Sequence, residues 1–246
     1  MERKILKCIR CGVECCCCPH CSSTNVIKSG KTQAHKQRYY CKECGKRYIT
    51  AYSYTAYQAD INQRIILFTK EGLGIRSTAR VLLISTTTLL KRIIAIAKNI
   101  KQPTISKGRV YEVDELRTYY RNKRTTIWIV YALDRRTKEV KSFNMGSRTN
   151  KTLRCVIRSL ELSQAKKIYT DKLKNYRYII NNKIHSTYIH GTNHIERKNL
   201  TLRTHLKRLN RRTICFSRSL LVLFSVLRIY FWAIPWGKKC KYLNKV

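Results

Sequence analysis

The chain has 246 residues, with 52 Lys and Arg against 13 Asp and Glu, so its formal net charge is +39. This excess of positive charge repels itself in a compact protein unless an anionic partner lies nearby. Nucleic acid is the partner that the charge favours, because each phosphate contact releases counterions. A ribosomal or membrane-surface protein is the alternative that charge alone leaves open.

The N-terminal segment is rich in cysteine, since nine of the twelve lie between Cys8 and Cys44. The chain starts with MERKILKCIRC, which lacks the apolar run of a signal peptide, so an intracellular metal site is favoured over a disulfide framework. The motifs CPHC and CKEC place two pairs of thiols 19 residues apart, a spacing typical of a zinc ribbon. We therefore predict a zinc ribbon over residues 1–50, folded largely by metal binding, with Zn²⁺ held by Cys18, Cys21, Cys41 and Cys44.

The cysteines that precede this motif allow more than one interpretation. Cys8 and Cys11 form another C-x-x-C pair, and Cys15 with Cys18 offers an alternative register; Cys16 and Cys17 lie between them. A second zinc site is one possibility, and we prefer to interpret these residues as spare thiols in a frayed N-terminus.

Residues 51–102 are predicted to form a helix-turn-helix region. A helical pattern from residue 57 to residue 100 is broken at EGLG, and Ser85 is placed as the N-cap of the helix that follows. We expect the front of that helix to contact DNA through Thr86, Thr87 and Thr88, with Lys91 and Arg92 near phosphates. A plain three-helix bundle is the alternative. Residues 103–108, which include Pro103, are predicted to be a linker.

Residues 109–234 alternate strand and helix patterns in the order β-β-β-α-β-(α)-β-α. A mixed sheet of this order can bring the first strand, which carries Asp114, beside the fourth strand, which ends at Asp171. The final helical run of that order carries Glu196. The longest apolar stretch, residues 220–234, contains Arg228 and is short for a membrane span, so we predict a buried terminal helix and no membrane partner. Residues 235–246 are predicted to be a basic tail.

Glu196 is conspicuous because it is the only acid from Lys172 to Val246, among 17 Lys and Arg. If Asp114, Asp171 and Glu196 converge, they can hold two hard cations such as Mg²⁺ about 4 Å apart, which would activate an attacking oxygen at a phosphodiester. Carboxylates suit such ions, whereas thiolates and imidazoles favour softer metals.

Each of these acids also has a structural interpretation. Glu196 follows Asn193 at the spacing of a capping box, which needs no catalysis. Glu112 or Glu115 could be the relevant acid in place of Asp114. Strand alternation places Glu112 on the same face as Asp114 and Glu115 on the other, which leaves Glu112 as the rival. Asp171 could be a turn residue at the end of its strand.

Several motifs together resemble the IS1-family transposases of bacterial insertion sequences. These are CPHCSSTNVIKSGKTQAHKQRYYCKECGKRY, GIRSTARVLLISTTTLLKRI, VDELRTYY, YALDRRTKEV, IYTDKLKNY and HIERKNLTLRTHLKRLNRRTICFSRS, which span residues 18–232. The resemblance implies a zinc-finger and helix-turn-helix region that binds terminal inverted repeats, and a ribonuclease-H-like α/β domain over residues 109–234. The expected fold is therefore a multidomain α+β protein.

The resemblance also implies roles for individual residues. Asp114, Asp171 and Glu196 match the DDE triad, which binds two Mg²⁺ or Mn²⁺ ions. Arg203 matches a basic residue two helical turns after the Glu, on the same helix face. Lys198 and Lys207 are expected to contact DNA with it. One departure is Lys172, which stands where the family usually has Gly after the second Asp.

The expected activity is that of a DNA transposase, which binds the inverted repeats, cleaves a strand to free a 3′-OH and joins it to target DNA. The family implies a homo-oligomer on double-stranded DNA, in the cytoplasm of a bacterium and associated with its nucleoid. Two alternatives stay open: a ribonuclease-H-like nuclease without strand transfer, and a non-catalytic DNA-binding repressor.

Overall fold

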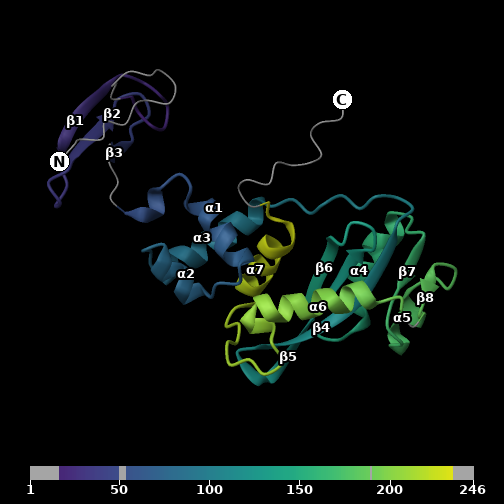
Figure 1. Ribbon diagram of the computed structural model, residues 1–246. Coiled ribbons are helices and arrows are strands. Elements are labelled where there is room, and N and C mark those ends of the chain that lie inside the picture. Colours follow the sequence, from purple (N-terminus) through teal and green to yellow (C-terminus); the bar gives the residue numbers. More distant parts are fainter. Residues whose placement is uncertain (1–16, 50–53, 189, 235–246) are drawn as a thin grey trace. The chain divides into compact units, whose positions relative to one another are not determined.

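The structure is a computed structural model that describes residues 17–49, 54–188 and 190–234. The chain divides into two compact units, Met1–Tyr57 and Gln58–Val246 (Figure 1). Cys8, Cys11, Cys15 and Cys16, with the basic tail over residues 235–246, lie outside the described residues, so the second-zinc interpretation stays a hypothesis.

The first unit contains a small antiparallel sheet of β1 (Val26–Lys31), β2 (Gln37–Cys41) and β3 (Arg47–Ile49), followed by a 3-10 turn, η1 (Thr55–Tyr57). β2 and β3 form a hairpin across CKEC, and Gly45 in its connection has a φ of +68°. The buried core of the sheet consists of Cys18, Cys41 and Tyr48. A core this small depends on a further crosslink for stability.

The second unit begins with three helices, α1 (Ile61–Lys70), α2 (Ile75–Val81) and α3 (Thr86–Asn99). Ser85 caps α3 as predicted, because its hydroxyl oxygen accepts the backbone N–H of Thr88 at 3.1 Å. The C-terminal helix α7 (Leu220–Trp232) packs against α1 and α3. This confirms the predicted buried terminal helix, and none of the described helices is long and apolar enough to cross a membrane.

The other part of this unit is a mixed five-stranded sheet in the order β6-β5-β4-β7-β8. Its strands are β4 (Val110–Tyr120), β5 (Asn122–Asp134), β6 (Val140–Gly146), β7 (Lys167–Tyr169) and β8 (His185–Ser186). The first three are antiparallel, and β4 pairs in parallel with β7, which confirms that the first and fourth strands are neighbours. The sequence predicts that the fourth strand ends at Asp171, whereas β7 ends at Tyr169.

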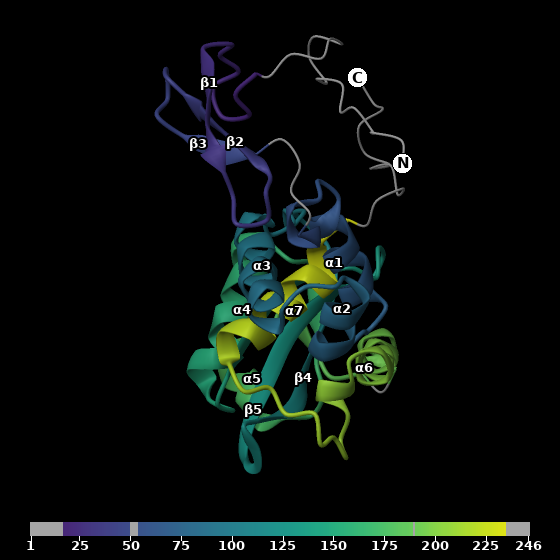
Figure 2. The ribbon, with the colours of Figure 1, turned by 90° about the vertical axis from the view of Figure 1, so that its left-hand side faces the viewer.

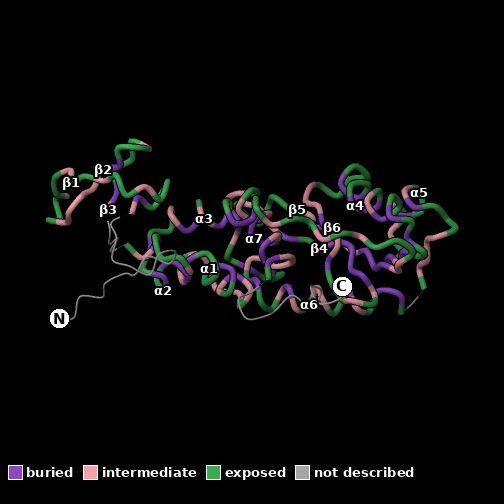
Figure 3. The backbone as a smooth tube through the Cα atoms, turned by 90° about the horizontal axis from the view of Figure 1, so that it is seen from above, coloured by how far each residue is buried: buried purple, intermediate pink, exposed green. Residues whose placement is uncertain are grey.

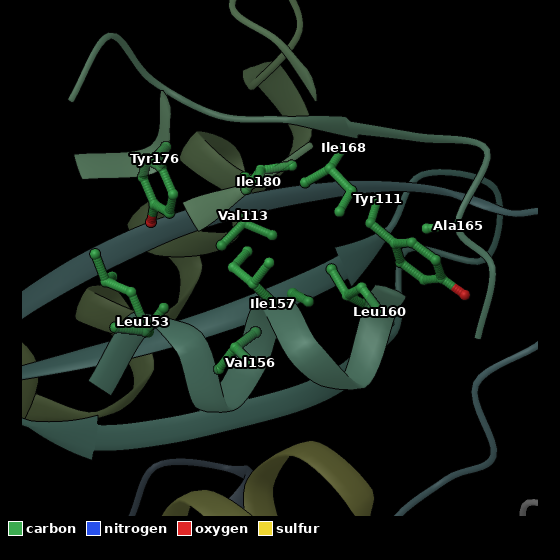
Figure 4. Close-up of a cluster of buried hydrophobic side chains, with 12 residues drawn as sticks. Tyr111, Val113, Leu153, Val156, Ile157, Leu160, Ala165, Ile168, Tyr176 and Ile180 are labelled. Atoms are coloured by element: carbon green, nitrogen blue, oxygen red, sulfur yellow. The ribbon is translucent and has the colours of Figure 1, made fainter. Parts of the chain in front are cut away.

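Helices cover both faces of this sheet. Figure 2 shows α4 (Asn150–Leu162) and α6 (Asn193–His205) on opposite sides of β4. α4 buries an apolar stripe against Tyr111, Val113 and Ile168 (Figure 4). Two short helices, α5 (Lys174–Ile179) and η2 (Lys207–Leu209), complete the unit. The strands β4 and β5 are buried over much of their length (Figure 3), because a sheet covered on both faces excludes water from both.

The terminal helix α7 also joins the helical region to the sheet. Phe143 on β6 lies against three of its aromatic rings, with centroid separations of 4.9 to 5.3 Å: Phe224, Phe231 and Trp232. The indole N–H of Trp232 donates to the Val140 carbonyl at 2.7 Å. The other side of α7 packs on α3, so the helices and the sheet share one hydrophobic interior.

Candidate active site

Asp114 lies on β4 with its side chain toward α6. One carboxylate oxygen accepts the N–H of Glu115 at 2.7 Å, and the other accepts the side-chain amide of Asn199 at 2.7 Å. The carbonyl of that amide accepts the Tyr131 hydroxyl at 2.7 Å, which fixes the amide so that its NH₂ group faces Asp114. Asn199 and Tyr131 therefore position the carboxylate of Asp114.

The pKa of Asp114 is raised to about 6. Burial is the main cause, and the N–H of Glu115 opposes it by stabilising the charged form. The negative charges of Asp171 and Glu196 raise the pKa further, while the Asn199 hydrogen bond lowers it. The structure thus brings the three predicted acids close enough for their charges to interact, and a bound cation would relieve that repulsion.

Asp171 reaches Asp114 through the parallel pairing of β4 with β7. Glu112 pairs with Tyr169, and extending this register by two residues brings Asp171 level with Asp114. Asp171 also makes the strand-end turn considered above, because its carboxylate accepts the N–H of Leu173 at 3.1 Å. Carboxylate oxygens of Asp114, Glu115 and Asp171 lie within 4.8 Å of one another, so these three fit a hard divalent cation.

Glu196 lies near this group without belonging to it. It is exposed in the first turn of α6, and its carboxylate accepts the Thr192 hydroxyl at 2.8 Å. Together with Asp114 and Glu115 it lines a cavity of about 1080 Å³. The capping box that was considered for Asn193 and Glu196 is wrong, because the N-cap residue of α6 is Thr192 rather than Asn193. The side chain of Thr192 makes no capping hydrogen bond.

The first turn of α6 is instead capped from the sheet by Glu112. This side chain is fully buried, and one of its oxygens accepts the N–H of Ile195 at 2.9 Å. The other lies 2.7 Å from His194 Nδ1 and 3.4 Å from Arg135 Nε. Glu112 is thus occupied by structural contacts, and the negative charge suits the N-terminus of a helix.

Basic residues form the other wall of the cavity: Arg203, Lys207, Arg211 and Arg212. The guanidinium of Arg203 donates to the Leu209 carbonyl at 2.8 Å, which holds it toward the segment after α6. Burial and the charge of Arg211 lower the pKa of Arg203, while the charge of Asp114 opposes this change. Lys198 does not line the cavity, and burial lowers its pKa. A basic wall beside acids suits a phosphodiester held next to cations.

The predicted contact residues on α3 lie in different surroundings. Thr86, Thr87 and Lys91 are exposed. The Thr88 hydroxyl accepts a hydrogen bond from Ser85 at 2.8 Å, and Arg92 donates to the Asn62 side chain of α1 at 2.9 Å. Two of the five expected contacts are therefore also used within the helical region.

In the first unit, the four cysteines of the two C-x-x-C motifs meet. Their sulfurs lie within 4.8 Å of one another, with Cys18 at 3.6 Å from Cys44 and Cys21 at 3.5 Å from Cys41. Zinc–sulfur bonds of about 2.3 Å in a tetrahedron place sulfurs roughly 3.8 Å apart, so the group fits a structural zinc ion. Although burial opposes it, hydrogen bonds from the backbone of His20 and Cys21 lower the pKa of Cys18 to about 6.

Comparison with known proteins identifies the family. The family model described as IS1 transposase matches residues 109–232, which is half of the chain. The chain belongs to the IS1 transposase family. This confirms the resemblance seen in the sequence, and the match contains β4, β7 and α6 with all three acids.

One solved structure resembles this IS1-family chain only remotely. It is a cryo-EM structure of a simian T-cell lymphotropic virus intasome in complex with the PP2A regulatory subunit B56 gamma. The identity is 17% and the TM-score 0.36, and the similarity covers 66% of each chain. The IS1-family chain thus spans slightly less than two thirds of that protein's length.

Two features of this IS1-family site were hidden in the sequence. Asn199 and Tyr131 position Asp114 from elements far apart in the chain, and only the i+3 spacing from Glu196 to Asn199 on one helix face could have pointed to the first of them. Lys172, which stands where the sequence resemblance implies Gly, is absent from the described residues with positive φ. The turn after Asp171 therefore does not need a glycine.

Proposed function

We propose that this IS1-family chain is a DNA transposase that binds the terminal inverted repeats of an insertion sequence and carries out metal-dependent strand cleavage and strand transfer. The observation that carries the proposal is that carboxylate oxygens of Asp114 and Asp171 lie within 4.8 Å of each other, beside a basic cavity that Asp114 and Glu196 both line. The element order β4-β5-β6-α4-β7-α5-β8-α6 supports a ribonuclease-H-like domain for it.

In this proposal Asp114, Asp171 and Glu196 hold two Mg²⁺ or Mn²⁺ ions. Such ions, when bound, activate the attacking oxygen and stabilise the leaving oxygen of the phosphodiester. Asn199 keeps Asp114 oriented and ionised, because its amide NH₂ group donates to the carboxylate. Arg203 and Lys207 bind the phosphates of the strand in the cavity.

The remaining parts serve DNA recognition. The zinc ribbon, with the four cysteines as zinc ligands, and the helix-turn-helix region, through the front of α3, bind the element ends. A homo-oligomer holds two ends together on double-stranded DNA, and the protein works in the bacterial cytoplasm on the nucleoid. Lys172 does not have the positive φ that favours glycine, so the backbone at this position is compatible with activity.

The test is an assay with purified full-length protein, labelled end DNA, target DNA and Mg²⁺ or Mn²⁺. We expect Glu196→Gln to lower cleavage by at least about a hundredfold, because the loss of a direct ligand should cost no less than the loss of an outer-shell partner, while end binding stays unchanged. The matched control is Glu139→Gln, which alters an exposed acid paired only with Lys141 in the described structure and should cleave normally.

Each outcome has a defined meaning. Strand joining by the wild type supports transposition, and cleavage without joining supports the nuclease alternative. If the wild type binds end DNA specifically but does not cleave it, and Asp171→Ala binds equally well, the result supports the non-catalytic repressor. Normal cleavage by Glu196→Gln contradicts the triad assignment.

A further inference from the structure

Glu115 is an acid beside Asp114 to which the proposed mechanism gives no role, and no structural contact occupies both of its oxygens. Its side chain is only 2% exposed, and its carboxylate lies with those of Asp114 and Asp171 within 4.8 Å. One of its oxygens, Oε1, is buried with no hydrogen-bond partner in the described structure. A buried carboxylate oxygen without a partner is costly, so its position beside two further acids points to a cation.

The neighbours of Glu115 leave this oxygen available. Arg148 contacts only the other oxygen, Oε2, at a long 3.4 Å, and its guanidinium lies over the Trp128 ring at 4.4 Å. Burial and the charge of Asp171 raise the pKa of Glu115. The nearby Tyr176 hydroxyl opposes this rise, yet it makes no regular hydrogen bond. One partly exposed Arg does not balance three carboxylates, whereas a divalent cation would.

We propose that Glu115 is a further metal ligand, which forms with Asp114 and Asp171 a cation site that exists before Glu196 engages. The inference rests on the proposed function, since it assigns the ligands of that same centre. Three carboxylates with oxygen ligands only suit Mg²⁺ or Mn²⁺ rather than a softer metal. Glu196 is outside the group and bonded to Thr192, so it is not needed for this site.

The proposal predicts that Glu115 is needed to bind the cation in the absence of DNA, whereas Glu196 is needed for cleavage but not for this binding. Mn²⁺ binding is measured on the zinc-saturated full-length protein without DNA, from the paramagnetic resonance signal of free Mn²⁺. We expect Glu115→Gln to weaken binding by at least about tenfold, the loss that even an indirect ligand partner causes when removed. Glu196→Gln should bind Mn²⁺ about as tightly as the wild type, because Glu196 lies outside the group of carboxylates that forms the site without DNA. Glu139→Gln serves as the control for the loss of one negative charge.

A second pair of variants separates a metal ligand from a structural acid. If Glu115 serves only to pair with Arg148 and Tyr176, then Arg148→Met and Tyr176→Phe release the same contacts. The proposal expects both variants, when folded, to bind Mn²⁺ at least as tightly as the wild type. The proposal is overturned if Glu115→Gln binds Mn²⁺ as tightly as Glu139→Gln does. It is also overturned if Arg148→Met loses as much Mn²⁺ affinity as Glu115→Gln.

Folding of each variant is checked by its thermal melting curve. If Glu115→Gln does not fold, Glu115→Asp keeps the charge and withdraws the carboxylate by one methylene. Weaker Mn²⁺ binding by that variant supports the proposal, and unchanged binding overturns it. Failure of the proposed function has a different signature, because the wild type would then bind Mn²⁺ through Glu115 and yet leave end DNA uncut.

Discussion

At the scale of single residues, the site depends on holding Asp114 close to other acids in a half-buried position. Burial and the charges of Asp171 and Glu196 raise its pKa to about 6, while the Glu115 N–H and the Asn199 amide favour the ionised form. These opposing effects keep the carboxylate charged at neutral pH at a cost in stability that a cation would offset.

The raised pKa predicts a specific dependence of stability on pH in protein without added Mg²⁺. The folded pKa of about 6 exceeds the usual 3.8, so the stability that Asp114 contributes is fully present below about pH 4 and is lost as pH rises through 6. The difference in free energy of unfolding between Asp114→Asn and the wild type should therefore shift in favour of the variant over this range, by about 3 kcal/mol at most.

Urea denaturation at several pH values between 4 and 7.5 measures this difference. Glu139→Gln, at an exposed surface pair, is the control and should show little change with pH. A difference between Asp114→Asn and the wild type that is constant over the whole range would contradict the raised pKa.

At the scale of elements, the position of α6 is set by β4. Glu112 and Asp114, two residues apart on one face of the strand, hold the first turn of the helix and Asn199 one turn further on. Glu196 and Arg203 are carried by the same helix, so the contacts of Glu112 determine where both side chains lie. Glu112 is thus a positioning residue for the proposed site.

Glu112→Ala should lower the free energy of unfolding by about 2–3 kcal/mol. The reason is that the variant loses a buried carboxylate that pairs with Arg135 and accepts the N–H of Ile195. Glu112→Gln should recover part of this loss, since its amide oxygen can still accept the Ile195 N–H. Urea denaturation gives the stability, and hydrogen exchange reports the first turn of α6. The interpretation fails if Glu112→Ala is as stable as Glu139→Ala, in which an exposed acid is removed.

At the scale of the whole molecule, the two units are stabilised in different ways. The second unit has a continuous interior, in which α7 joins the helices to the sheet. In the first unit, the core of the described small sheet consists of Cys18, Cys41 and Tyr48, with Val26, Tyr39 and Cys44 packed beside them. Its stability is therefore expected to depend on the zinc ion.

Removal of zinc with a strong chelator should unfold residues 17–49 and leave the sheet and helices of the second unit folded. Hydrogen exchange of the two units, followed with the release of zinc, measures this outcome. Cys18→Ser should behave like the chelated protein, and Cys155→Ser, at an exposed thiol of the second unit, should behave like the wild type. Amides in residues 17–49 that stay protected after chelation would show that zinc does not stabilise this unit.

The sequence by itself determined the order of strands and helices, the four-cysteine group, the Ser85 cap and the family. These features follow from local patterns, because apolar periodicity, paired thiols and capping residues act over a few positions. Only the tertiary structure decided that Glu112 caps α6, that Asn199 and Tyr131 hold Asp114, and that Glu115 rather than Glu196 lies with Asp171. Those distances depend on the parallel register of β4 with β7 and on the placement of α6 across the sheet, which no local pattern encodes.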